Sequence, residues 1–364
     1  MHIVQFQHTR VPVEKYGGAQ RIVVWLSQAL VEMGHDVTLL AGRGSKVPGV
    51  RVVEIDAETV RAPGFDPRRY ISHPVDIMHY HSTVLNPPRV PYVETLHGNM
   101  GPGRAASPHT ICVSENHARR HGTSAYVLNG VRLDEYEFRS RKSDFDLFLA
   151  RLHSVKGWRI AVAAAKSVPF KLIVAGGWRP SFSRWVKFVG EVGGARKREL
   201  LAGARCLWMP VQWEDPCPVN VLEALASGTP VLATPRGSLR ELVGADGGGI
   251  GAGVAELLAL RSRVEQFDSI AVDGRLQKDP ATATFSTLVV SPRNCREGLH
   301  GLVVAELEHP RARQPLDPIG EVEPQVLELE MLRPDEGVVG PFRDPLARDG
   351  GVLAAIRLEQ GDPG

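Results

Sequence analysis

Residues 213–234 read Trp-Glu-Asp-Pro-Cys-Pro-Val-Asn-Val-Leu-Glu-Ala-Leu-Ala-Ser-Gly-Thr-Pro-Val-Leu-Ala-Thr, and this stretch decides the fold. Its pattern predicts a loop, a helix and a buried strand. Asn220 and Glu223 have the spacing of a capping box, which predicts that the helix begins at Asn220. Gly228 is typical of the residue that ends a helix. The apolar run 231–234 has the length and the flanking turn residues of a buried parallel strand.

Two acidic residues, Asp215 and Glu223, bracket the start of this predicted helix. Free backbone N–H groups at a helix start favour an anion such as a phosphate. Taken alone, Glu223 is more typical of a helix cap, and Asp215 is an ordinary loop acid. A more specific pattern is formed by two acids separated by seven residues, when the second acid opens the string Glu-Ala-x-Ala-x-Gly-x-Pro-Val. The whole string resembles the donor-nucleotide motif of family 4 of the retaining GT-B glycosyltransferases.

This resemblance implies that Glu223 accepts hydrogen bonds from ribose hydroxyls and Asp215 from sugar hydroxyls. It also implies that the start of the helix contacts the donor. The sequence departs from the family at Asp215, where a Glu is usual, and at Pro218, where a Gly is usual. Pro218 removes a backbone donor that a glycine would offer. The predicted donor-binding residues of this segment are Cys217, Val219, Asn220 and Val221.

Length and charge indicate two domains and an anionic ligand. The chain has 364 residues, enough for two ordinary domains. Its 43 Lys and Arg and 41 Asp and Glu give a net charge of +2, so we expect no nucleic-acid partner. Residues 141–213 hold fourteen basic residues against four acidic ones, which suits an anionic ligand or, equally simply, a solvated basic face.

The cysteines and the apolar runs predict a cytoplasmic protein. The four cysteines lie far apart, which favours a reducing compartment and argues against a disulfide framework or a zinc ribbon. The sequence begins directly with an apolar strand pattern, without a signal-peptide leader. No run of eighteen apolar residues predicts a transmembrane segment.

A first βα series predicts a doubly wound domain over residues 1–138. A strand is expected at 2–7, a helix at 21–33 and a second strand at 36–41. Gly17 and Gly18 precede the helix, but without Gly-x-Gly-x-x-Gly, so a nicotinamide-binding site is not favoured. The two glycines can bring backbone N–H groups to a phosphate, as the family resemblance implies, or form a simple tight turn. Further strands are expected at 50–55, 75–80, 91–96, 110–113 and 125–128.

His97 follows a predicted strand, so it should lie at the carboxyl end of the sheet, where such sheets bind ligands. A lone loop histidine is more often structural. The segment 95–98, Thr-Leu-His-Gly, also resembles the family segment whose His lies near the transferred sugar. His79 and His81 alternate along a strand without a third metal ligand at suitable spacing. They are interpreted as ordinary strand residues.

A second series predicts the nucleotide-sugar domain over residues 139–266. Arg151 and Lys156 follow its first strand, and two cations in one loop can converge on a diphosphate. Arg-Leu-x-x-x-Lys-Gly is also the family pattern, although a solvated basic turn is the simpler alternative. The segment Gly190, Glu191 and Val192 resembles the part of the family that holds the nucleotide base through backbone groups. Strands are expected at 146–150, 170–175, 186–190, 206–210 and 231–234, and helices at 158–167, 197–204, from 220, from 238 and at 254–266.

The resemblance covers about residues 1–245, and residues 267–364 form a divergent, proline-interrupted tail that is either folded differently or partly disordered. We therefore expect a GT-B fold, with two Rossmann-like domains facing each other across a cleft. The implied activity is transfer of a hexosyl group from a nucleoside-diphosphate sugar, with retention and without a metal or other cofactor. A non-catalytic nucleotide-sugar binding protein, an epimerase and a dinucleotide-dependent oxidoreductase remain alternatives. The acceptor is not specified.

Overall fold

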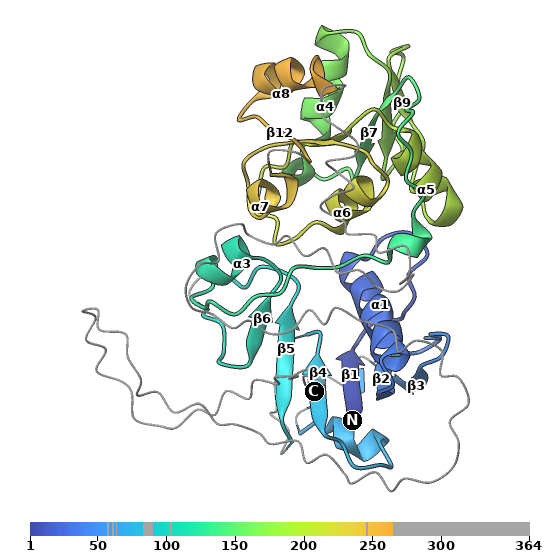
Figure 1. The fold of residues 1–364 in the computed structure, drawn as a ribbon, viewed down its shortest axis with the longest axis vertical. Helices are drawn as coiled ribbons and strands as arrows, with labels where there is room; N and C mark the ends of the chain where they lie inside the picture. The colour runs from blue at the N-terminus through green and yellow to red at the C-terminus, as the bar shows by residue number, and fades with distance from the viewer. Residues whose placement is uncertain are drawn as a thin grey trace, which may run out of the picture.

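The structure is a computed structural model that describes residues 1–264 except 57, 60–61, 63, 83–89, 102–103 and 245–246. Two parallel sheets stand one above the other, each covered by helices (Figure 1). The predictions for the tail 267–364, and for the end of the helix predicted at 254–266, lie outside the described residues.

The N-terminal sheet has the strand order β3-β2-β1-β4-β5-β6, and every pair is parallel. This order is that of the doubly wound dinucleotide fold, in which the direction of winding reverses between the first and fourth strands. The run predicted as a strand at 125–128 forms only an isolated bridge between Tyr126 and Cys112. The strands are β1 (His2–Gln7), β2 (Asp36–Gly42), β3 (Arg51–Ile55), β4 (Ile77–Tyr80), β5 (Tyr92–Leu96) and β6 (Thr110–Cys112).

The C-terminal sheet repeats the same order with its own strands, β12-β11-β10-β7-β8-β9. Its direction of winding reverses between β7 and β10, the positions that correspond to β1 and β4. The last strand was not predicted, because its glycine-rich sequence has low strand propensity. The strands are β7 (Asp146–Leu149), β8 (Leu172–Ala175), β9 (Val186–Phe188), β10 (Leu207–Met209), β11 (Val231–Ala233) and β12 (Gly248–Ile250).

Helices cover both faces of the C-terminal sheet. Alternate residues along each strand face opposite sides, so Phe148 packs with α4 and α8 while Leu147 and Leu149 pack with α5 and α6. The helices are α1 (Gly18–Glu32), α3 (Glu115–Arg120), α4 (Trp158–Ser167), α5 (Gly194–Gly203), α6 (Val219–Ala226), α7 (Leu239–Val243) and α8 (Val254–Arg261). Short 3-10 turns occupy η1 (Pro67–Tyr70), η2 (Leu133–Glu135) and η3 (Ser154–Lys156). No helix in the described part of the chain is long and apolar enough to cross a membrane.

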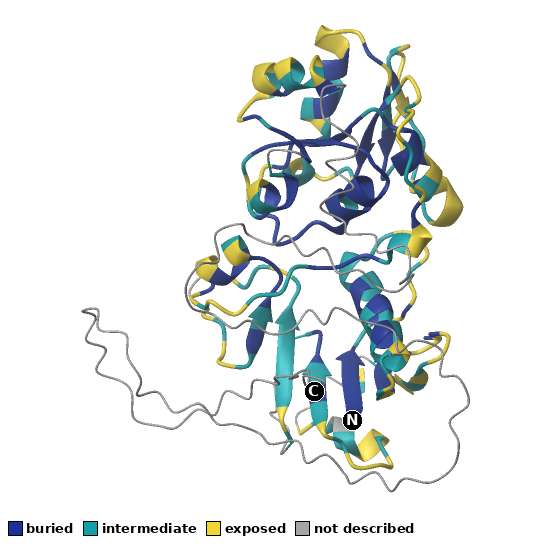
Figure 2. Ribbon diagram, viewed as in Figure 1, coloured by how far each residue is buried: buried dark blue, intermediate teal, exposed yellow. Residues whose placement is uncertain are grey.

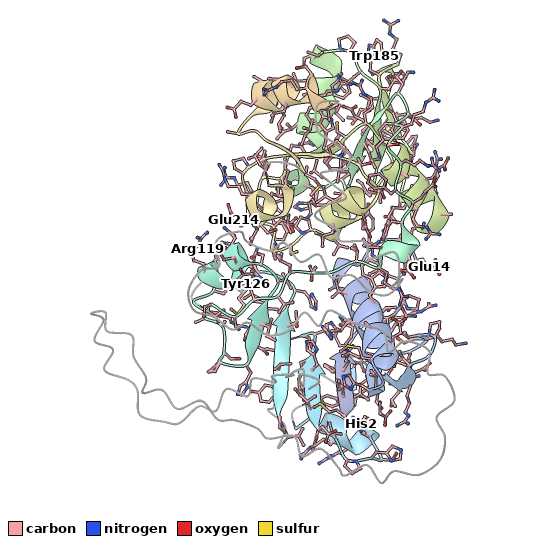
Figure 3. All side chains as sticks on the ribbon, in the orientation of Figure 1. His2, Glu14, Arg119, Tyr126, Trp185 and Glu214 are labelled. Atoms are coloured by element: carbon pink, nitrogen blue, oxygen red, sulfur yellow. The ribbon has the colours of Figure 1, made fainter. Side chains whose placement is uncertain are left out.

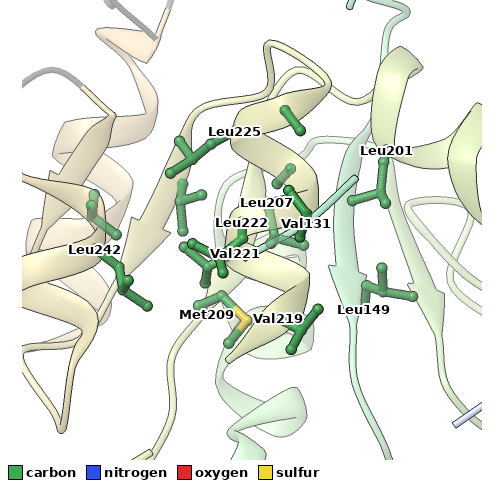
Figure 4. Close-up of a cluster of buried hydrophobic side chains, with 14 of the residues drawn as sticks. Val131, Leu149, Leu201, Leu207, Met209, Val219, Val221, Leu222, Leu225 and Leu242 are labelled. Atoms are coloured by element: carbon green, nitrogen blue, oxygen red, sulfur yellow. The ribbon is translucent and has the colours of Figure 1, made fainter. Parts of the chain in front are cut away.

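The largest apolar core surrounds α6 and extends into the first domain (Figure 4). Helix α6 is buried along nearly its whole length, as the dark blue ribbon in Figure 2 shows. Ile22 and Trp25 of α1 and Val131 of the connecting segment belong to the same cluster. Burying side chains of this size contributes roughly 1.5–3 kcal/mol each. The central helix predicted from sequence is therefore also the element that joins the two domains.

Candidate active site

The loops after the carboxyl ends of both sheets meet each other, and this region is called the junction below. Figure 3 shows Glu14 and Glu214 at this level, on opposite sides of the molecule. The Asn99 amide, after β5, donates to the Glu214 carbonyl at 2.8 Å, and the Asn129 amide donates to the Cys217 carbonyl at 2.9 Å. The junction therefore contains the two points at which doubly wound sheets bind ligands.

Lys156 and Asp215 form an ion pair at the reversal point of the C-terminal sheet. Lys156 Nζ lies 2.5 Å from Asp215 Oδ2, and the two side chains are 17% and 7% exposed. The Trp213 indole N–H also donates to Asp215 at 3.2 Å, and Lys156 lies over the Trp213 ring at 4.9 Å. A Cβ at Gly157 would overlap the carbonyl of Pro210, so the loops after β7 and β10 are tightly packed. The predicted cation and the predicted acid are thus neighbours with fixed positions.

Arg151 is exposed at the end of β7 and lies close to Tyr16 of the first domain. Burial, reinforced by the charge of Glu191 and opposed by that of Arg151, raises the pKa of Tyr16 to about 12. The Tyr16 hydroxyl is buried without a hydrogen-bond partner among the described residues. A Cβ at Gly176 would lie 2.6 Å from this hydroxyl. An unpaired hydroxyl thus lies beside the predicted phosphate-binding cation.

Glu223 is fully buried and does not cap α6, so the capping-box prediction is wrong. The N-cap residue is Pro218, without a side-chain hydrogen bond. Glu223 Oε1 instead accepts from the Tyr136 hydroxyl at 2.7 Å and from Lys197 Nζ at 2.6 Å. Arg21 of α1 approaches the same oxygen at 3.2 Å. Glu223 therefore bonds with residues from three other segments, because the charge-assisted partners outweigh a local cap.

The second carboxylate oxygen, Glu223 Oε2, has no partner among the described residues. The pKa of Lys197 is lowered by burial, although the Glu223 charge opposes this shift. Asn220, the predicted cap, donates its amide to the Leu149 carbonyl at 2.7 Å. It therefore ties the start of α6 to the end of β7.

The helix predicted from 238 is α7, and its N-cap residue, Ser238, makes no side-chain capping hydrogen bond. Glu241 of α7 accepts from the backbone N–H groups of Glu115 and Asn116 at 3.0 and 3.1 Å. These groups lie at the start of α3, so the acid caps a helix of the other domain. Burial raises the pKa of Glu241. The contact links the two domains.

The predicted glycines lie at the junction. Gly17 has φ 133° and is the N-cap of α1, and a Cβ at Gly18 would lie 3.3 Å from Val219 Cγ2. Gly190 has φ 76° and its carbonyl accepts from the Gly176 N–H at 2.7 Å. The positive φ angles of Gly17 and Gly190 favour glycine, and at Gly18 a Cβ would fit only tightly against Val219.

The remaining predicted donor-binding residues divide by exposure. Glu191 is exposed, and Val192 packs against the core. The side chains of Cys217, Val219 and Val221 are buried in the core, so only their backbone groups can meet a ligand. Burial raises the pKa of the Cys217 thiol to about 12.

His97 follows β5 at the junction and belongs to a group of histidines. Its Nε2 lies 3.0 Å from Nδ1 of His81, and the two rings are stacked with centroids 5.2 Å apart. Burial lowers the pKa of His97 to about 4 and that of His81 well below its usual range. Both rings are therefore neutral at neutral pH. Within the described residues, no set of three potential ligands is placed to hold a metal ion.

The sequence interpretation missed several residues at the junction. Gly176, directly after a predicted strand, could have been found from its Gly-Gly pair. Tyr16 could have been found from its place directly before the predicted site residue Gly17. Tyr136, Lys197 and Arg21 carried no local signal, because each meets Glu223 only in the folded chain.

The comparisons with known proteins agree with this geometry. Residues 146–267 match the family model described as glycosyl transferases group 1. A search of curated proteins finds no significant match. Among solved structures, AviGT4, a glycosyltransferase involved in avilamycin A biosynthesis, is 25% identical over 75% of this chain and 95% of its own, with a TM-score of 0.58.

Two further solved structures show the same fold. Sucrose-phosphate synthase from Thermosynechococcus elongatus is 16% identical over 75% of this chain and 94% of its own, with a TM-score of 0.59. HepE from Anabaena, in complex with UDP-glucose, is 15% identical over 75% and 97%, with a TM-score of 0.52. The predicted arrangement of two doubly wound domains is confirmed.

Proposed function

We propose that this chain, which has the GT-B glycosyltransferase fold and matches the glycosyl transferases group 1 family over residues 146–267, transfers a hexosyl group from a nucleoside-diphosphate sugar to an acceptor, with retention of configuration. The observation that carries this proposal is the Lys156–Asp215 ion pair at the reversal point of the C-terminal sheet, with Arg151 in the same loop. Residues 1–138 would form the acceptor side and residues 139–266 the donor side.

Arg151 and Lys156 would act on the leaving group. In the transfer, the bond between the anomeric carbon and the diphosphate oxygen breaks, and its electron pair leaves with the diphosphate. An acceptor oxygen forms the new bond to the anomeric carbon, and its proton passes to the departing diphosphate. The two cations stabilise the charge that develops on the diphosphate, which can contribute about 3 kcal/mol per donor group. We propose that this arrangement needs no metal ion.

Asp215 and Glu223 would hold the donor hydroxyls. Asp215 keeps a carboxylate at the junction, where Lys156 and Trp213 fix its orientation. Glu223 Oε1 is engaged by protein groups, so Oε2 is the oxygen left for a ribose hydroxyl. Glu223→Gln should weaken donor binding if this assignment holds. Unchanged donor affinity would reduce Glu223 to a structural role.

Thermal stabilisation by nucleotides tests the proposal first. HepE is in complex with UDP-glucose, so UDP and UDP-glucose come first, followed by GDP, ADP and their sugars, with NAD as a control. A ligand at about 100 times its Kd adds ~2.7 kcal/mol to stability. A melting shift with one nucleoside diphosphate supports the donor site, whereas a shift with NAD alone would favour an oxidoreductase.

Turnover separates the enzymatic alternatives. Release of nucleoside diphosphate from the stabilising donor, lost in Lys156→Ala at saturating donor, is expected for a transferase. A changed sugar without released nucleotide would indicate an epimerase. Binding without either product would indicate a nucleotide-sugar binding protein, which Pro218 favours.

Cys112, Cys206 and Cys217 are free thiols, which supports a proposed cytoplasmic location.

A further inference from the structure

On one face of the N-terminal sheet, the two central strands, β1 and β4, carry polar side chains, where a parallel sheet is normally apolar. On β1 and β4, Gln5 pairs in register with His79, and the next residues, Phe6 and Tyr80, point to the opposite, apolar face. His81 continues the polar face beyond β4, and its backbone N–H donates to the Phe6 carbonyl at 2.9 Å. The polar row therefore runs along neighbouring strands up to the junction.

Hydrogen bonds pair part of this polar row, whereas Gln5 Nε2 and His81 Nε2 have no partner among the described residues. Ser27 of α1 donates to Gln5 Oε1 at 2.6 Å, and His79 Nε2 lies 2.7 Å from Thr95 Oγ1. The His79 and His81 ring centroids are 4.2 Å apart. Buried polar groups are costly unless they are paired, so a row of this kind calls for a purpose beyond packing.

The row ends in the pair of His81 and His97. His81 is 5% exposed, whereas His97 is partly exposed at the junction. His81 Nδ1 and His97 Nε2 are 3.0 Å apart, and both rings are neutral. In a neutral pair one of these nitrogens must carry a proton and the other must not. The tautomer of one ring therefore fixes the tautomer of the other.

We propose that His81 is a positioning residue that fixes the ring orientation and the tautomer of His97. The other nitrogen of His97, Nδ1, then meets a hydroxyl of the transferred sugar or the acceptor in one defined role, as donor or as acceptor. Without His81, the His97 ring can turn over and both tautomers are populated. This inference rests on the proposed function and on the family resemblance, which implies that His97 lies near the transferred sugar.

Three substitutions of His81 separate its two nitrogens. Asn places its amide near the position of Nδ1, which faces His97, and Gln places its amide near the position of Nε2. Leu removes both polar groups. All three remove the imidazole ring, so a loss of ring packing is common to them.

Turnover is measured as release of nucleoside diphosphate from the nucleotide sugar that stabilises the protein. H81L and H81Q should lower kcat roughly tenfold to a hundredfold, because misplaced catalytic groups cost rate of this order. H81N should stay within about threefold of the unmodified protein, and the donor KM should be unchanged in all three. Full kcat in H81L, or rescue by Gln and not by Asn, would overturn the proposal.

A readout without turnover keeps this inference separate from the transferase proposal. Nitrogen-15 NMR of the imidazole rings at neutral pH reports the tautomer of His97, assigned with H97N. One tautomer is expected in the unmodified protein, and a mixture in H81L. Absence of turnover with every nucleotide sugar would refute the transferase, whereas a single His97 tautomer in H81L would refute the role of His81.

Discussion

Replacing Lys197 with Met tests whether the buried Glu223 network holds the core of the second domain. Lys197 Nζ lies 2.6 Å from Glu223 Oε1, and the two side chains are 8% and 1% exposed. Removing one partner of a buried pair costs about 3–5 kcal/mol, because the other charge stays buried without compensation. Arg21 remains 3.2 Å from the same oxygen, so we expect the lower end of this range, about 3 kcal/mol.

The assay is thermal unfolding at pH 7.5, followed by circular dichroism. With an unfolding entropy of about 2.1 cal/mol/K per residue, a loss of 1 kcal/mol lowers the Tm of a 364-residue chain by roughly 1–2 °C, so Lys197→Met should lower it by about 3–6 °C. The double variant Lys197→Met, Glu223→Met removes both charges and should recover most of this loss. The double-mutant cycle then gives a coupling energy of roughly 2 kcal/mol.

Two results would refute this reasoning. A Tm of Lys197→Met within 2 °C of the unmodified protein would mean that Tyr136 and Arg21 alone satisfy the carboxylate. A double variant as unstable as the sum of the two single variants would mean that Lys197 and Glu223 are energetically independent. Donor affinity is measured on the same variants, so that a loss of stability can be distinguished from a loss of donor binding.

Three further perturbations have defined outcomes. Gly237→Ala should reduce turnover, because its Cβ would overlap the Asp215 backbone. The control Gly194→Ala, at a similar positive φ but with open space around it, should keep turnover, and equal effects of the two substitutions would contradict the argument. Burial lowers the pKa of Lys142 to about 7, below its value in the unfolded chain. Because the unfolded chain then binds more protons between pH 7 and pH 10, the free energy of unfolding should rise there by up to about 1.4 kcal/mol per pH unit, and urea titrations of Lys142→Met should lack this rise. His97 and His117 have pKa values lowered to about 4, so the unfolded chain binds more protons between pH 6.5 and pH 4, and stability should fall by about 2 kcal/mol per histidine from pH 7 to pH 5; a flat urea midpoint would argue against this.

Local patterns were sufficient for most of the fold. The strand at 2–7 and the helix at 158–167 lie where the sequence predicts them, and α6 begins within one residue of the expected position. Periodicity reports these elements because side chains at a spacing of 2 or about 3.6 residues face one buried surface. Repetition of the βα unit then indicates a parallel, doubly wound sheet.

Local patterns failed where distant residues compete for the same group. Asn220 and Glu223 satisfy the capping rule, yet Lys197, Tyr136 and Arg21 approach Glu223 from three other segments. In a buried site, two cations and a hydroxyl compensate the Glu223 carboxylate more fully than one backbone N–H at a cap would. Glu241 likewise does not cap its own helix, because two backbone N–H groups at the start of α3 donate to its carboxylate.

The sequence by itself determined two doubly wound domains, the position of the central helix, and the acids and cations of the candidate site. Only the tertiary structure decided that Lys156 pairs with Asp215, that Glu223 is buried between the domains, and that His81 supports His97. Burial removes water from these groups and leaves each charge or ring nitrogen to the partners that folding brings near. Those partners lie 16 to 202 residues away along the chain, beyond the reach of any local pattern.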